Sequence, residues 1–152
     1  MKKQCKRKVR PLIYNPIGYV IDGARITSDR VLDKLRMLEL GSLESMKSGA
    51  GTITDWSHLT DMVNLAEQFA KDGVGIEVME YCQIAQAAMI ETAEYYEQTK
   101  TMKLSDAGLY ALREVYAYHD LQRQSVSRAQ YESMINKMVL RLRSKGRDVV
   151  EV

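Results

Sequence analysis

The chain has 152 residues, an apolar content of 45% and a formal net charge of +2, values typical of one globular domain. No apolar run approaches the roughly 20 residues of a membrane-spanning helix, and the basic start lacks the apolar stretch of a signal peptide. The two cysteines, Cys5 and Cys82, are far apart in the sequence and are expected to be reduced thiols. We therefore expect a cytoplasmic protein.

The charge is sorted by position. Residues 1–10 hold six Lys/Arg and no acid, and residues 128–147 hold six Lys/Arg against one acid. The stretch between them, residues 11–127, holds ten bases and seventeen acids. Two basic ends on an acidic body favour a macromolecular partner over a small substrate.

The first elements in chain order are a basic arm and a short helix. Residues 1–11 are highly charged and end at a proline, which predicts a flexible arm. Asn15-Pro16 is typical of a helix start, and this helix is expected to run to about residue 22. The helical domain is predicted to span residues 12–146, with a tail at 147–152.

Two amphipathic helices are expected next. Thr27-Ser28-Asp29 opens the first of them, which contains Gly41 and closes before Gly49. Thr54-Asp55 is predicted to cap the second, whose apolar residues recur at three and four until Gly73.

The last three predicted helices complete the domain. Residues 76–99 form the longest, and its small alanines make it the candidate central helix. Ser105-Asp106 opens the next, and Ser127 with Gln130 forms a capping box for the last, which ends at Gly146. No segment alternates as a strand does. The sequence thus predicts an all-α, single-domain antiparallel helical bundle of five to six helices with a flexible basic N-terminal arm.

The basic segments are candidates for contact with nucleic acid. Lysine and arginine neutralise phosphates and release counterions, so a basic arm beside a basic helix resembles a nucleic-acid footprint. Alternatives are contact with the acidic surface of a protein and a merely solvated face. The candidate nucleic-acid-binding residues are Lys6, Arg7, Lys8 and Arg10 in the arm and Arg128, Lys137, Arg141 and Lys145 on the last helix.

Residues 121–134 suggest a helix-turn-helix, because a tight turn precedes a basic helix. Arg128 and Gln130, near its start, are the residues such a motif would use to read bases. The match is partial: Ser125 stands at the usual glycine, and Asp120 and Gln124 occupy positions that are normally buried. An ordinary pair of helices is the alternative.

An acidic line on the fourth predicted helix is the candidate surface for a protein partner. Glu91, Glu94 and Glu97 recur at a spacing of three, beside Tyr95 and Tyr96. The line is either a solvated face or a docking surface for a basic partner. The chain's tyrosines fit three roles: core packing, anchoring at a protein interface, and stacking on unpaired bases.

Catalytic and metal-binding patterns are missing from the sequence. His58 and His119 are the only histidines, and neither has the ligands of a metal site beside it. His58 is expected at the surface and His119 half-buried. No nucleophile motif or phosphate-binding glycine loop occurs. We expect no metal, no cofactor, no small-molecule substrate and no enzyme activity.

Several stretches resemble a family of small prophage- and plasmid-borne proteobacterial proteins, some of which are classed as Fis-type regulators. These stretches are KRKVRPL at 6–12, NPI at 15–17, DWSHLTDMVNLAE at 55–67 and ALREVYAYHDLQRQSVSRAQYE at 111–132. The resemblance implies a mobile element in a bacterial cytoplasm and carries over no functional residues.

The leading hypothesis is an accessory or regulatory protein of a prophage or plasmid. It would bind nucleic acid, or a nucleic-acid–protein complex, through its basic ends. One alternative is a protein-binding inhibitor of a host defence system, similar in role to an anti-CRISPR, that uses the acidic line. Another is a structural homodimer that pairs through the fourth helix.

Overall fold

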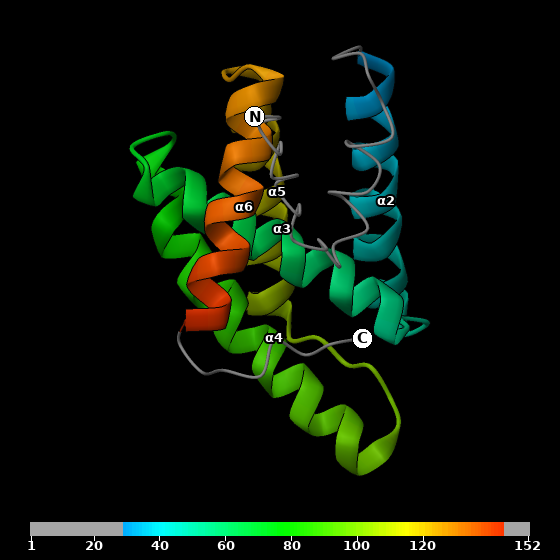
Figure 1. Cartoon of the computed structure of the whole chain (residues 1–152). Coiled ribbons are helices and arrows are strands. Elements are labelled where there is room, and N and C mark those ends of the chain that lie inside the picture. The colour runs from blue at the N-terminus through cyan, green and yellow to red at the C-terminus, as the bar shows by residue number, and fades with distance from the viewer. Residues whose placement is uncertain (1–28, 145–152) are drawn as a thin grey trace, which may run out of the picture.

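The computed structural model of the chain describes residues 29–144. The predicted basic arm, the helix after Asn15-Pro16, Lys145 and the tail lie outside these residues. Within them the fold is an all-α bundle without strands, as predicted (Figure 1). Its elements are α2 (Asp29–Ser48), α3 (Ile53–Lys71), the 3-10 helix η1 (Ile76–Val78), α4 (Met79–Thr99), α5 (Asp106–Gln124) and α6 (Arg128–Ser144).

Local side-chain hydrogen bonds set the helix starts. Ser105 caps α5 as predicted, accepting from the backbone N–H of Gly108 at 3.1 Å. The predicted capping box at the start of α6 is also present, in both directions between Ser127 and Gln130. The predicted cap of α3 was wrong by two residues, because Thr52 is the N-cap and Asp55 closes a capping box with it.

The segment predicted as one helix over residues 76–99 is helical throughout, but its first turn is a 3-10 helix. Gly75 adopts a left-handed backbone with φ of 64°, and the chain makes its first turn as η1 before α4 begins at Met79. Gly41 does not interrupt its helix, because α2 continues through this position. Cys82 on α4 is a buried thiol, and Cys5 lies outside the described residues.

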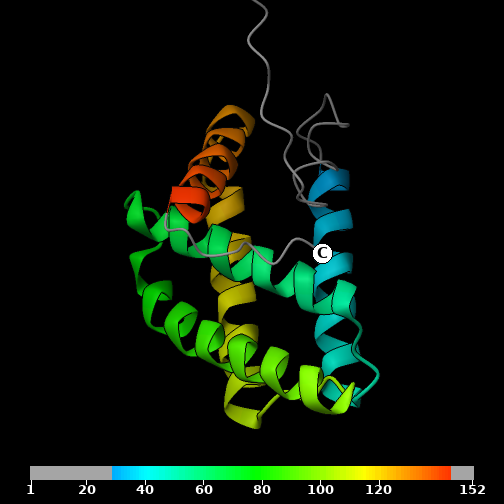
Figure 2. The same cartoon turned by 60° about the horizontal axis from the view of Figure 1, so that its bottom comes forward.

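The central helix is α3, so the prediction that α4 is central was wrong. α3 packs against α2, α4, α5, α6 and η1, whereas α4 packs mainly against α3, α5 and η1. In Figure 2, α3 crosses the middle of the molecule, with α4 on one side of it and α6 on the other. α3 can occupy this place because it is apolar on more than one side, whereas one side of α4 faces outward and is exposed.

Two apolar clusters share α3. Leu59, Met62 and Ala66 of α3 belong to the larger cluster, which α4 and α5 complete with residues such as Met89 and Leu112. The smaller cluster lies between α2, α3 and α6 and consists of Leu35, Leu65, Phe69, Tyr131, Met134, Ile135 and Met138. The apolar side of α6 is therefore the side that holds this helix on α3.

Candidate interaction surfaces and a buried polar network

Two of the basic residues predicted to bind nucleic acid, Lys137 and Arg141, form a line on α6 that lies against acidic groups of α3. The Arg141 guanidinium donates to the Glu67 carboxylate at 2.6 Å and to the backbone carbonyl of Asn64 at 3.2 Å. One turn earlier, the Lys137 ammonium pairs with Asp72, the residue that ends α3. Only 15% of the Arg141 side chain is exposed, against 51% of Lys137. These two bases therefore help to hold α6 on α3.

Arg128 also forms an intrachain ion pair, with Glu132 one turn along α6, at 3.0 Å. Of the eight predicted nucleic-acid-binding residues, the structure thus describes three, and all three pair with acids of the same chain. The other five, which are Lys145 and the four residues of the arm, lie outside the described residues.

Glu67 is the acceptor that joins three helices. In addition to Arg141 of α6, it accepts a hydrogen bond from Gln86 of α4 at 2.9 Å. Burial alone would raise the pKa of Glu67, but these two hydrogen bonds outweigh it and lower the pKa. Glu67 therefore stays ionised, and its charge is the one that Arg141 neutralises.

The acidic line on α4 has the opposite character. Glu91, Glu94 and Glu97 are exposed, and within residues 29–144 none of them forms an ion pair. The 21 residues of α4 contain four glutamates and no lysine or arginine. Its predicted tyrosines differ: Tyr95 is 40% exposed, whereas Tyr96 is half-buried beneath the Lys100 ammonium, 5.4 Å from the ring centroid.

Apolar side chains accompany these acids on the outside of α4. Ile84 is 44% exposed and Ile90 is 53% exposed. Figures 1 and 2 show α4 at the edge of the bundle. The outer face of α4, defined here by Ile84, Ile90, Glu91, Glu94, Tyr95 and Glu97, combines apolar anchors with negative charge, as protein interfaces do.

The segment predicted as a possible helix-turn-helix consists of α5, a three-residue turn and α6. The two side chains that such a motif would use to read bases are both engaged locally. Gln130 accepts from the backbone N–H of Ser127 at 2.9 Å, and Arg128 pairs with Glu132. Asp120, expected at a normally buried position of the motif, is half-buried in ion pairs with Arg36 and Arg123.

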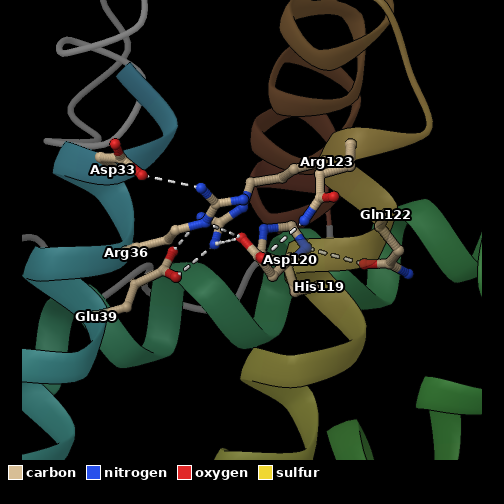
Figure 3. Close-up of polar contacts among 8 residues, drawn as sticks. Asp33, Arg36, Glu39, His119, Asp120, Gln122 and Arg123 are labelled. Carbon is tan, nitrogen blue, oxygen red and sulfur yellow. Dashed lines mark hydrogen bonds and ion pairs between the residues drawn. The ribbon is translucent and has the colours of Figure 1, made fainter. Parts of the chain in front are cut away.

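A buried polar network between α2 and α5 was not predicted (Figure 3). Arg123 of α5 donates two hydrogen bonds to Glu39 of α2, at 2.7 and 2.9 Å, and both side chains are fully buried. Asp120 accepts from Arg36 at 2.7 Å and from Arg123 at 3.2 Å, which extends the network toward the surface. The signal was in the sequence: Glu39 lies four residues from both Leu35 and Leu43, on the apolar face of α2.

Protonation in this network follows from burial and charge. Burial raises the pKa of Glu39, although Arg123 acts against it. The pKa of Asp120 is lowered, because the Arg36 hydrogen bond and the Arg123 charge outweigh its partial burial. The paired charges are therefore mutually dependent: removing one leaves the other buried without compensation.

His119 continues the network on α5 and is fully buried, where the sequence predicted half-burial. Its Nδ1 donates to the Gln122 side-chain oxygen at 2.9 Å, and Gln122 donates to the carbonyl of Val74 at 2.8 Å and to that of Ala66 at 3.2 Å. Burial, assisted by the Arg123 charge, lowers the pKa of His119 to about 3. The imidazole is therefore neutral and holds Gln122, whose side-chain amide ties α5 to α3 and to the turn after it.

The other histidine, His58, is partly buried, whereas the sequence predicted a position at the surface. His58 Nδ1 lies 3.2 Å from the Ser42 hydroxyl, with which it shares a hydrogen bond between α3 and α2. Among the described residues, no group of three His, Cys, Asp or Glu side chains is placed to hold a metal ion. The polar groups of the interior thus connect helices to one another.

Within residues 29–144, no helix combines the length and the apolar character needed to cross a membrane. Comparisons with protein-family models, with curated proteins and with solved structures found no match to this chain.

Proposed function

We propose that the protein is a non-enzymatic protein-binding module, and that the outer face of α4 binds a basic surface on its partner. One contrast carries the proposal. Three of the four described bases of α6, namely Arg128, Lys137 and Arg141, are paired with acids of the same chain, whereas the glutamates of α4 have no such partner among the described residues. Negative charge is thus the charge that α4 offers to another molecule.

The composition of this face favours a protein over a nucleic acid. Glutamates repel the phosphates of a nucleic acid, whereas they attract the lysine and arginine side chains of a protein. Ile84, Ile90 and Tyr95 supply apolar area that a partner can bury between the charges. Such a mixture is suited to a protein surface that itself evolved to bind phosphate.

The same charges argue against pairing of two α4 helices. With four glutamates and no lysine or arginine on α4, a second copy would place like charges together. A partner with a basic groove avoids this repulsion. On this proposal the protein is an inhibitor that occupies the nucleic-acid channel of a host protein. Its resemblance to prophage- and plasmid-borne proteins favours such an origin and action in the cytoplasm.

Nucleic-acid binding through the arm is the second candidate. It is favoured by the six Lys/Arg and no acid in residues 1–10. It predicts that deleting residues 1–10 weakens binding to duplex DNA or RNA and reduces the salt dependence of that binding. Under the protein-binding proposal, the same deletion leaves partner binding nearly unchanged.

The proposal is tested by retention of host proteins on the tagged full-length chain in a nuclease-treated proteobacterial lysate. Wild type is compared with Glu94→Lys/Glu97→Lys and with Glu44→Lys, an exposed glutamate on α2. The proposal expects basic proteins that wild type and Glu44→Lys retain and the α4 variant loses. Retention unaffected by the α4 changes, and lost on deletion of residues 1–10, would overturn it in favour of the second candidate.

A further inference from the structure

A cluster of three tyrosines lies where α4 meets α5, near the start of α4. The rings of Tyr81 and Tyr118 are stacked, with centroids 5.8 Å apart, and Tyr110 meets Tyr81 edge-on at 6.4 Å. Tyr81 and Tyr118 are partly exposed, and Tyr110 is 58% exposed. Three aromatic rings therefore come together at the surface of the bundle, where Tyr81 and Tyr118 also pack against the larger apolar cluster.

Acids surround this cluster. Glu114 lies midway between Tyr110 and Tyr118 on α5, four residues from each, so all three share one helix face. Glu80 is next to Tyr81 on α4, and no Lys or Arg pairs with either glutamate within residues 29–144. The pKa of Tyr81 is raised, first by Tyr110 and burial and then by Glu114, Tyr118 and Glu80. The field at the cluster is therefore one that disfavours negative charge.

We propose that this tyrosine cluster, with Glu114 and Glu80, binds an arginine side chain of the basic partner. A guanidinium group is planar, so it stacks on an aromatic face while its N–H groups donate to a carboxylate. Tyr81 and Tyr118 are too close for a cation to lie between them. The guanidinium therefore stacks on an outward ring face, with that of Tyr110 the most accessible, and donates to Glu114.

The inference rests on the proposed function and makes it more specific. Tyr81 is about ten residues before Glu91 on α4, which corresponds to ~15 Å along the helix axis. A basic groove that covers the outer face of α4 can therefore reach both sites at once. The cluster supplies a defined anchor for one arginine, and the glutamates supply charge attraction along the rest of the helix.

The test uses the amino-acid derivative alone, without the partner. N-acetyl-arginine methyl ester is titrated into the full-length protein while the tyrosine ring signals are followed by NMR. N-acetyl-citrulline methyl ester, which has nearly the same shape and no charge, is the ligand control. We expect the arginine derivative to shift the signals of Tyr81, Tyr110 and Tyr118 saturably, and the citrulline derivative to shift them little.

Two variants keep the test independent of folding. Tyr110→Ser removes a largely exposed ring and is expected to lower the affinity for the arginine derivative by about 2- to 5-fold. Glu114→Gln keeps all three rings and is also expected to lower this affinity. Leu140→Ser, which changes an exposed apolar side chain on α6 away from both proposed sites, is the control and is expected to leave the affinity unchanged.

The results separate this site from the proposed function. No saturable shift, an equal shift with citrulline, or a stronger response to a short single-stranded oligonucleotide would overturn the arginine site. If that happens while Glu94→Lys/Glu97→Lys still abolishes partner retention, the proposed function stands without this anchor. If the arginine derivative binds but Glu94→Lys/Glu97→Lys leaves the retention of lysate proteins unchanged, the arginine site stands and the proposed function fails.

Discussion

At the residue scale, the interior of this protein depends on a few polar side chains with single, specific partners. His119 is the clearest case, because it is fully buried and its Nδ1 has one hydrogen-bond acceptor, Gln122. A buried imidazole that cannot take up a proton makes the folded state sensitive to acid. Single substitutions can test the contribution of His119 to stability, and that of Gly75, which lies against Gln122.

His119 predicts a loss of stability between pH 6.5 and about 3. Above pH 6.5 the imidazole is neutral in both the folded and the unfolded state. As the pH falls below 6.5, only the unfolded state takes up a proton, because the folded pKa is about 3. The free energy of unfolding then falls by about 1.4 kcal/mol per pH unit, or about 2–3 kcal/mol by pH 4.5.

The variant His119→Phe isolates this effect in urea unfolding at pH 7 and pH 4.5. It loses the hydrogen bond to Gln122 at both pH values but has no proton to gain. The stability difference between wild type and variant should therefore shrink by about 2–3 kcal/mol at pH 4.5. Asp61, whose pKa burial raises to about 7, acts in the opposite direction, but it is common to both proteins and cancels. Parallel pH profiles would contradict the assignment.

Replacing Gly75 with alanine is expected to lower the free energy of unfolding for two reasons, backbone strain and a close contact. Its φ of 64° is left-handed, and an added Cβ would lie 3.0 Å from Gln122 Cγ. Gly73 is the matched control, because its φ is 88° and nothing lies within 4 Å of an added Cβ. Each Gly→Ala change should cost ~1–2 kcal/mol from backbone strain. In urea unfolding, Gly75→Ala should lower the free energy of unfolding clearly more than Gly73→Ala. Equal losses would show that the Gln122 side chain moves aside without a measurable energetic cost.

At the element scale, the helices are held in place by charges whose partners lie on other helices. The Glu39–Arg123 pair joins α2 to α5, and Arg141 with Glu67 joins α6 to α3. The sequence predicted each helix well, because apolar spacing and capping are local. It did not predict these pairs, because a charge within an apolar face does not reveal which helix supplies its partner.

Breaking the Glu39–Arg123 pair should be more harmful than replacing it. Glu39→Leu leaves the Arg123 charge buried with only Asp120 to offset it, and we expect a loss of about 3–5 kcal/mol in the free energy of unfolding. The double variant Glu39→Leu/Arg123→Met leaves neither charge and should cost much less than Glu39→Leu alone. A double-mutant cycle by urea unfolding measures the coupling. Additive losses would contradict the view that the two charges depend on each other.

Arg141 predicts an effect on stability that Arg143 lacks. Arg141→Met removes charged hydrogen bonds to Glu67 and to Asn64, so the free energy of unfolding should fall by about 1.5–3 kcal/mol. Arg143→Met changes an exposed side chain on the same helix and should stay within ~0.5 kcal/mol of wild type. Thermal or urea unfolding compares them. Equal stability of the two variants would show that the line of bases is not part of the α3–α6 interface.

At the scale of the whole molecule, the sequence predicted the class of fold and missed how its charges are used. The all-α bundle followed from helical periodicity and turn residues. The identity of the central helix did not, because small alanines on α4 indicated close packing without indicating how many neighbours it has. The basic line on α6 was visible, but its acidic partners on α3 are about 70 residues away in sequence, so it resembled an unpaired surface.

The most direct measurement is the affinity of the full-length protein for a nona-arginine peptide and for duplex DNA, each followed by fluorescence anisotropy across a salt series. The account predicts that the peptide binds, that binding weakens as salt rises, and that Glu94→Lys/Glu97→Lys abolishes it while Glu44→Lys leaves most of it. The contradicting result is that the peptide fails to bind, while DNA binds and loses affinity on Lys137→Gln. The bases of α6 would then serve an outside partner, and the acids of α4 would not.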